Sequence, residues 1–207
     1  MSTKSKPKLT IELIPSTCHF SNIRTTVTPS EWDKIRFISY ANANNKCEIC
    51  GGNGKEQGYK HNVECHEIWN YDDVNHIQTL TGLISLCVNC HQVKHIGRSI
   101  AIGKEKTCFN QLARVNNWTL NQIQEHIKSS FELHKERSKY QWKLDLSLLT
   151  KEPYNIILKE NNERIFKVKK YKKKPKVKGA PKTIHPRAKL PAALKTKQIG
   201  NKKPPKK

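Results

Sequence analysis

Two pairs of cysteines, each with two residues between its members, constrain this chain more than any other feature. They are Cys47 and Cys50 in CEICGG and Cys87 and Cys90 in CVNC, with 36 residues between the pairs. This spacing lets paired thiolates reach one tetrahedral zinc ion at about 2.3 Å. In a chain expected in the cytosol, seven cysteines also favour metal binding over disulfides. The sequence therefore predicts a structural Zn²⁺ held by these four thiolates; the alternative is four buried or reactive thiols.

A closed four-sulfur site leaves two nearby histidines without a role. His91 follows the last cysteine directly, and His95 lies four residues further on, in CVNCHQVKHIG. Residues four apart lie on the same face of a helix and can chelate one ion, and Gly97 is expected to end this helix. The spacing thus suggests a second metal. The alternatives are a pair of surface histidines, or a site in which His91 replaces one cysteine.

Charge is distributed very unevenly along the 207 residues, whose net charge is +22. Residues 169–207 hold sixteen of the 39 Lys and Arg and no acidic residue, so residues 1–168 have 23 basic and 17 acidic side chains, a net of +6. Such a Pro-rich, weakly apolar tail is expected to be disordered. Its charge predicts binding to DNA or RNA; the alternatives are a solubilising tail or ribosome-type RNA association. The basic cluster that opens the tail is Lys169, Lys170, Lys172, Lys173 and Lys174.

No apolar run is long enough for a membrane helix, and the first residues lack the apolar core of a secretory signal. We therefore expect a cytoplasmic protein with no membrane partner.

Hydrophobic periodicity predicts strands near both ends of the folded part and helices between them. Strands are expected over 8–15 and 142–149 and could pair to close the domain. Helices are expected over 30–45 with Ser30 as N-cap, over 105–115, and over 119–139, where Thr119 begins a capping box. A further strand pair is expected over 155–159 and 164–168.

Between the two cysteine pairs lies VECHEIWNYDD, in which a strand would hold His66 between Cys65 and Glu67, with Glu64 one strand period away. This segment, followed by LISLCVNCH at 83–91, resembles the HNH, or His-Me finger, nucleases. In that family a ββα-metal core lies in a treble-clef zinc scaffold. The order CxxC, histidine-bearing hairpin and LCxxCH opening a helix is similar to a bacterial and phage subgroup, over about residues 47–98.

The resemblance implies an α+β fold: a small treble-clef, ββα-metal zinc core with flanking helices and strands and a disordered basic C-terminal tail. The expected regions are an N-terminal strand and helix (1–46), the core (47–98), a helical extension with a closing strand (99–150), a short extension (151–168) and the tail (169–207).

The resemblance also implies specific roles for histidines. His66 is the general base, and His91 and His95 bind a catalytic ion such as Mg²⁺, Mn²⁺ or Zn²⁺. Two positions depart from the family pattern. Cys65 stands where an acidic or histidine ligand is common, so Cys65, or Glu64 or Glu67 in its place, is a candidate ligand. Gly82 stands where the family has an asparagine that orients the base.

The implied activity is an HNH endonuclease that hydrolyses DNA phosphodiesters through a water molecule activated by His66. Lys94 and Arg98, near the end of the expected helix, are candidate phosphate contacts. The main alternative is a non-catalytic treble-clef zinc protein that binds DNA or RNA. A third possibility is a structural or ribosome-associated RNA-binding protein.

Overall fold

The computed structural model describes residues 6–158. The chain divides into two units, Met1–Glu160 and Asn161–Lys207, and the second lies outside the described residues. The first unit contains β1 (Glu64–Asp72), β2 (Ile77–Leu86) and β3 (Lys143–Asp145). Its helices are η1 (Ser16–Cys18), α1 (Ile23–Thr26), α2 (Pro29–Asn42), η2 (Lys55–Gln57), α3 (Val88–Lys94), α4 (Ile96–Ala101), α5 (Glu105–Asn116), α6 (Leu120–Arg137) and η3 (Ser147–Thr150). The predicted α+β class is confirmed.

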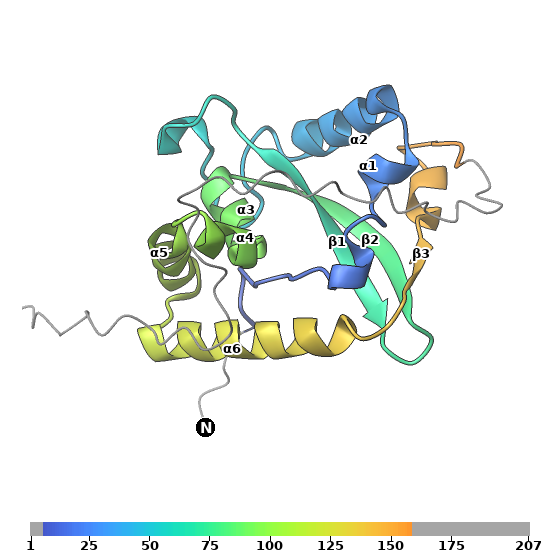
Figure 1. The fold of residues 1–207 in the computed structure, drawn as a ribbon. Coiled ribbons are helices and arrows are strands. Elements are labelled where there is room, and N and C mark those ends of the chain that lie inside the picture. Colours follow the sequence, from blue (N-terminus) through green and yellow to red (C-terminus); the bar gives the residue numbers. More distant parts are fainter. Residues whose placement is uncertain (1–5, 159–207) are drawn as a thin grey trace, which may run out of the picture. The chain divides into compact units, whose positions relative to one another are not determined.

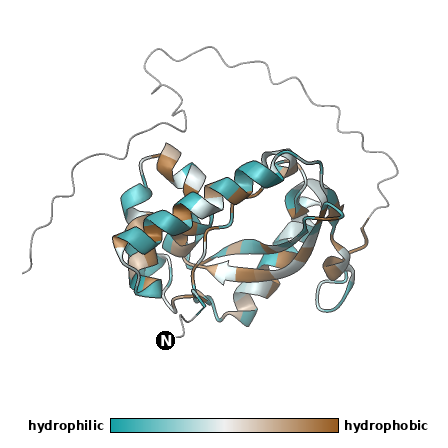
Figure 2. Ribbon diagram, turned by 90° about the horizontal axis from the view of Figure 1, so that it is seen from below, coloured by the Kyte–Doolittle hydropathy of each residue, from teal (hydrophilic) through white to brown (hydrophobic). Residues whose placement is uncertain are grey.

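The hairpin of β1 and β2 is the centre of this unit. The two strands pair antiparallel, and β3 adds to β2 in parallel, which gives the order β1-β2-β3. The α2 helix lies along one side of the hairpin and α6 along the other (Figure 1). Viewed from the α6 side, that helix presents mainly hydrophilic residues outward (Figure 2). The hairpin is therefore covered from both sides.

The three long helices agree with the prediction, with one difference in a cap. The α2 helix begins earlier than expected because Thr28, not Ser30, is its N-cap: the Thr28 hydroxyl accepts from the Glu31 amide, and the Glu31 carboxylate accepts from the Thr28 amide. Pro29 fits the first helical position, where no N–H is needed. Thr119 caps α6 as predicted, with Gln122 completing the capping box.

The predicted N-terminal strand is wrong. Leu9 and Ile11 are buried, but residues 10–15 run as an extended segment outside the sheet. Side chains of α5 and α6 form hydrogen bonds with the backbone of this segment. The Leu9 amide donates to Asn116 Oδ1 at 3.0 Å, and Asn116 Nδ2 donates to the Leu9 carbonyl at 2.7 Å. The Ile11 amide donates to His126 Nε2 at 3.0 Å. The alternating pattern therefore reflects burial between helices, and the predicted pairing of this segment with the closing strand does not occur.

The closing strand is shorter than expected. Only Lys143–Asp145 pairs with β2, after which the chain turns into η3 and buries Leu146 and Leu149. Residues 155–158 form no strand, and the second strand of that predicted pair lies outside the described residues. Within residues 6–158, none of the helices has the length and apolar character needed to cross a bilayer.

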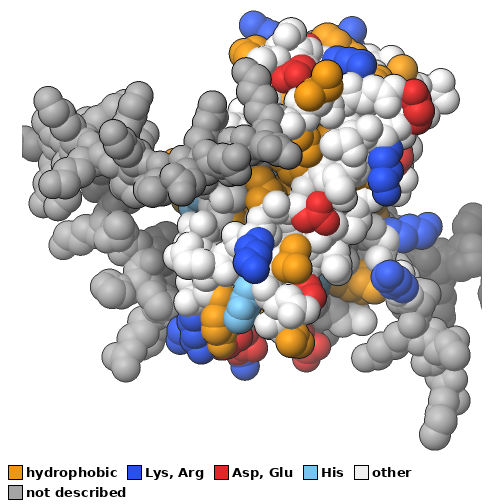
Figure 3. All heavy atoms as spheres, turned by 90° about the vertical axis from the view of Figure 1, so that its right-hand side faces the viewer, with side chains coloured by type: hydrophobic (Ala, Val, Ile, Leu, Met, Phe, Trp, Pro, Cys, Tyr) orange, Lys and Arg blue, Asp and Glu red, His pale blue; other side chains and the backbone are white. Residues whose placement is uncertain are grey.

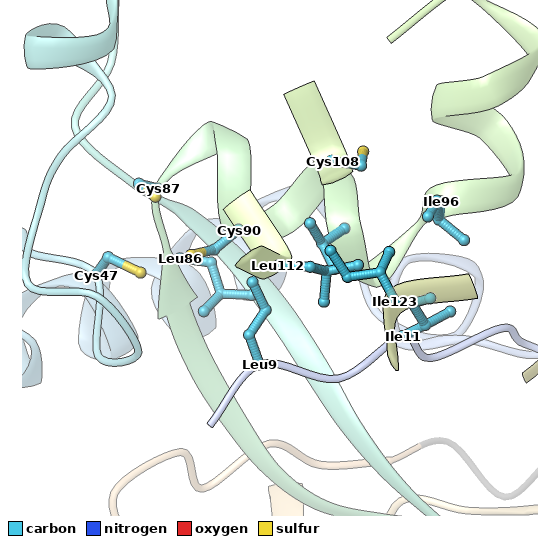
Figure 4. Close-up of a cluster of buried hydrophobic side chains, with 11 residues drawn as sticks. Leu9, Ile11, Cys47, Leu86, Cys87, Cys90, Ile96, Cys108, Leu112 and Ile123 are labelled. Atoms are coloured by element: carbon cyan, nitrogen blue, oxygen red, sulfur yellow. The ribbon is translucent and has the colours of Figure 1, made fainter. Parts of the chain in front are cut away.

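Two buried clusters make up the core. The first joins the N-terminal segment to α3, α5 and α6 and includes the thiols of the cysteine pairs (Figure 4); it contains Leu9, Ile11, Leu86, Val93, Ile96, Leu112 and Ile123. The second contains Ile23, Ile35, Leu80 and Leu149 with their neighbours. Burial of these side chains fixes the hairpin against the helix that follows it.

Candidate metal centres

The thiols of Cys47, Cys50, Cys87 and Cys90 converge, with their sulfurs all within 4.8 Å of one another. The first pair lies on a tight turn, where the Cys47 amide donates to the Gly52 carbonyl and the Gly51 amide to the Cys47 carbonyl, both at 2.8 Å. Gly51 has φ +75°, which favours glycine. The second pair brackets the start of α3, with Cys87 as its N-cap. These four cysteines could hold a metal ion such as zinc.

The electrostatics of the thiol cluster also fit a cation. Cys50 Sγ and Cys87 Sγ are 3.5 Å apart, and the Gln111 side-chain amide donates to Cys90 Sγ at 2.9 Å. Hydrogen bonding with Cys47 lowers the pKa of Cys50 and raises that of Cys90. The sulfurs therefore cannot all ionise side by side unless a positive charge lies among them.

His66, His91 and His95 form a second cluster, whose ring nitrogens also lie within 4.8 Å of one another. His66 projects from β1, His91 from α3, and His95 from the junction between α3 and α4. The Nε2 atoms of His91 and His95 are 3.1 Å apart. Burial lowers the pKa of His66, and burial together with the charges of His91 and His66 lowers that of His95 to about 3. Both rings are therefore neutral near pH 7, the form that binds metals.

Two carboxylates support the histidines from behind. Glu64 Oε2 is 2.5 Å from His91 Nδ1, and Glu12 Oε2 is 3.0 Å from His66 Nε2. The hydrogen bond with His91 lowers the pKa of Glu64. Burial alone would raise the pKa of Glu12, but His66 and Lys94 together lower it to about 2. A carboxylate behind an imidazole fixes its tautomer and orientation, as it does around many metal sites.

Glu12 is the part of this site that the sequence analysis missed. It lies in the N-terminal segment, 54 residues before His66, and its backbone amide donates to the Lys94 carbonyl at 3.2 Å. The only local sign is an acidic residue in the apolar run KLTIELIP. The spacing of the histidines contains no information about this contact.

Three residue predictions need correction. Cys65 does not join the histidines: it lies on the other side of β1, beside Ser39 of α2, and burial raises the pKa of its thiol to about 12. Lys94 is not a free phosphate contact, because it is 5% exposed and donates to Thr10 and to the Glu12 carboxylate. Gly97 does not end a helix; the break comes at His95, and α4 continues through Gly97.

The other positions singled out in the sequence are Arg98, five lysines of the tail and Gly82. Arg98 is exposed on α4 and available to a ligand. Lys169, Lys170, Lys172, Lys173 and Lys174 lie outside the described residues. Gly82 pairs with Ile68 next to a bulge in the hairpin, at 68/69, so no side chain reaches the histidines from that position.

Comparison of the chain with known protein families, with curated proteins and with solved structures finds no match in any of the three. The functional argument therefore depends on the geometry of the two clusters.

Proposed function

We propose that this protein is an HNH-type endonuclease that hydrolyses phosphodiester bonds of DNA, on a treble-clef scaffold held by a structural zinc ion. The observation that carries the proposal is the convergence of His66, His91 and His95 within 4.8 Å, on a hairpin and the helix that follows it. Structural cores seldom collect three buried or half-buried histidines with a carboxylate behind two of them. The arrangement matches what the resemblance implies for these three positions.

In this proposal His91 and His95 hold the catalytic divalent ion. Their facing Nε2 atoms and the Glu64 carboxylate behind His91 suit an imidazole-binding ion such as Zn²⁺ or Mn²⁺ better than Mg²⁺, which prefers oxygen ligands. When bound, the ion would stabilise the negative charge that grows on the phosphate and on the departing oxygen.

His66 acts as the general base. Because Glu12 is ionised, it accepts a hydrogen bond from His66 Nε2–H, which leaves the lone pair of the neutral ring on Nδ1. Among the described residues, nothing bonds to that buried Nδ1 atom. It can therefore take a proton from a water molecule that attacks phosphorus. Glu12 thereby takes over the orienting role of the family asparagine, which is Gly82 here.

In this proposal, affinity for nucleic acid comes from the positive charge concentrated in residues 169–207. The side of the folded unit near η3 shows acidic and basic side chains interspersed, without a patch of one sign (Figure 3). The sixteen cations of residues 169–207, with the exposed Arg98 of α4, are the better candidates for phosphate contacts.

The test is nicking of supercoiled plasmid by the zinc-loaded protein, with Mg²⁺, Mn²⁺ or additional Zn²⁺, and with His66→Ala prepared in parallel to exclude a contaminating nuclease. We expect relaxed circles with at least one ion and none with His66→Ala. If no ion supports cleavage while DNA binding is retained, the proposal is wrong and a non-catalytic nucleic-acid-binding zinc protein is the better description.

A further inference from the structure

A cavity of about 190 Å³ adjoins His66, between β1, the N-terminal segment and α6. Its walls include Glu12, His66, Trp69, Tyr71, Leu133 and Arg137. Figure 1 shows the N-terminal segment passing between the hairpin and α6. Pockets for drug-sized ligands typically measure about 300–1,000 Å³. This one suits a single small ring system.

Two hydrogen-bond donors in this wall have no partner. Trp69 Nε1 and Tyr71 Oη are both buried, and neither bonds to any of the described residues. With His66 Nδ1, three polar atoms of residues in this wall lack a partner. The great majority of buried polar atoms are satisfied, so the two donors among the three indicate a ligand that supplies acceptors. Burial raises the pKa of Tyr71, which keeps its hydroxyl protonated and able to donate.

The charges of the cavity argue against a phosphate. The Arg137 guanidinium is already bound to Asp73 through two hydrogen bonds of 2.7 and 2.8 Å, and it lies 4.5 Å over the Tyr71 ring. Glu12 adds a carboxylate to the wall, and burial lowers the pKa of His134, which leaves that ring uncharged near pH 7. An anion would meet a carboxylate and no unpaired cation among the described lining residues.

The remaining features fit a neutral, flat heterocycle. Ile11, Leu13, Ile14 and Leu133 supply apolar surface, and Trp69 and Tyr71 supply aromatic rings. Nucleobases have carbonyl and ring-nitrogen acceptors for the indole N–H and the phenol O–H, and their faces stack on aromatic side chains. We propose that this cavity binds a single unstacked nucleobase of the substrate strand. This inference builds on the proposed nuclease function, because His66 belongs both to the histidine cluster and to the cavity wall.

A base held here would fix the strand beside the proposed general base. Extruding a base from a duplex costs a few kcal/mol, and least where the base is mismatched or already single-stranded. The site therefore predicts a preference for substrates with an unpaired base next to the cleaved bond.

The test is an NMR titration of the ¹⁵N-labelled, zinc-loaded full chain with cytidine, thymidine, adenosine and guanosine, without added divalent ion. The chain has four tryptophans, and Trp69→Phe identifies the Trp69 indole N–H signal. We expect that signal to move with at least one nucleoside, while the signal of Trp118, which packs against the other buried cluster and does not line the cavity, stays in place. Inorganic phosphate serves as the anion control.

Tyr71→Phe removes only the hydroxyl and should weaken nucleoside binding about three- to tenfold, the effect of one neutral hydrogen bond. Tyr40→Phe on α2 is the matched control and should bind as wild type. If no nucleoside moves the Trp69 signal, or only phosphate does, the proposal is overturned and the cavity holds water or an anion. Because the titration involves no cleavage, active plasmid nicking without nucleoside binding would refute this inference alone. Nucleoside binding without nicking would refute the nuclease alone.

Discussion

Cys90 and His91 are neighbours in α3, yet the clusters to which they belong differ in the properties that decide what a metal site does. The thiol cluster has four members that can complete a tetrahedron, and Cys47, Cys87 and Cys90 are at most 2% exposed. The histidine cluster has three members, and the His91 side chain is 21% exposed. A complete, buried shell of thiolates is typical of structural zinc, while an incomplete, accessible shell leaves room for water and substrate.

The support around the two clusters differs as well. The thiols are positioned by local structure, such as the turn that joins Cys47 to Gly52, and by a hydrogen bond from Gln111 of α5 to Cys90. The histidines depend on Glu12 and Glu64, which approach from other parts of the chain. One cluster is therefore expected to govern whether the protein folds, and the other whether it reacts.

The largest effect should come from opening the thiol cluster. Cys90→Ser is expected to release the zinc and unfold the first unit, because apparent zinc-binding energies of roughly 10–16 kcal/mol are also folding energy. Zinc content and thermal unfolding measure this. Cys108→Ser, at a buried cysteine outside the cluster, should keep the metal. Retention of stoichiometric zinc and native stability by Cys90→Ser would show that these thiols do not hold a structural ion.

Local spacing made the thiol cluster and much of the histidine cluster predictable. Two residues between cysteines and three between His91 and His95 set which side chains can meet, and capping boxes such as the one at Thr119 mark helix ends. Glu12 and the burial of Lys94 could not be predicted, because their contacts span 54 and 82 residues and depend on how the N-terminal segment packs. The same packing explains why Leu9 and Ile11 alternate with polar residues as in a strand, although they belong to no sheet.

The second largest effect should be catalytic. His66→Ala is expected to reduce plasmid cleavage by roughly 100- to 10,000-fold, the contribution of a positioned general base. The variant should stay folded and keep its zinc, with a lower thermal stability because a buried ring and the partner of Glu12 are removed. His19→Ala, an exposed histidine far from the cluster in sequence, is the control and should cleave normally. Wild-type cleavage by His66→Ala with every divalent ion would refute the mechanism.

Replacing His91 should act through the metal and not through the base. His91→Ala is expected to weaken binding of the second ion at least about 10- to 100-fold, so a higher ion concentration should restore part of the cleavage. The same addition should not restore His66→Ala, and His95→Ala should behave like His91→Ala. Titration of cleavage against ion concentration distinguishes these outcomes; equal rescue of all three variants would mean that His66 is a ligand and not the base.

The smallest effect concerns the support behind His66. The folded-state pKa of Glu12, about 2, lies below its ordinary value of 4.5, so the ionised carboxylate stabilises the fold above about pH 4.5. That contribution disappears as the pH falls toward 2. Glu12→Gln imitates the protonated form and should lower the free energy of unfolding near pH 7. We expect a difference on the order of 1–2 kcal/mol, because solvent screens a side chain that is 37% exposed.

Urea denaturation of wild type and Glu12→Gln across this pH range gives the measurement. Acid also protonates the zinc-binding thiolates, but it does so in both proteins, and that loss cancels in their difference. The difference should be constant from pH 7 to about 5 and should shrink below pH 4.5. Glu67→Gln, on the same strand as His66, is the control and should differ little from wild type at any pH. A difference for Glu12→Gln that stays constant into acid would show that the Glu12 carboxylate does not stabilise the fold through its charge.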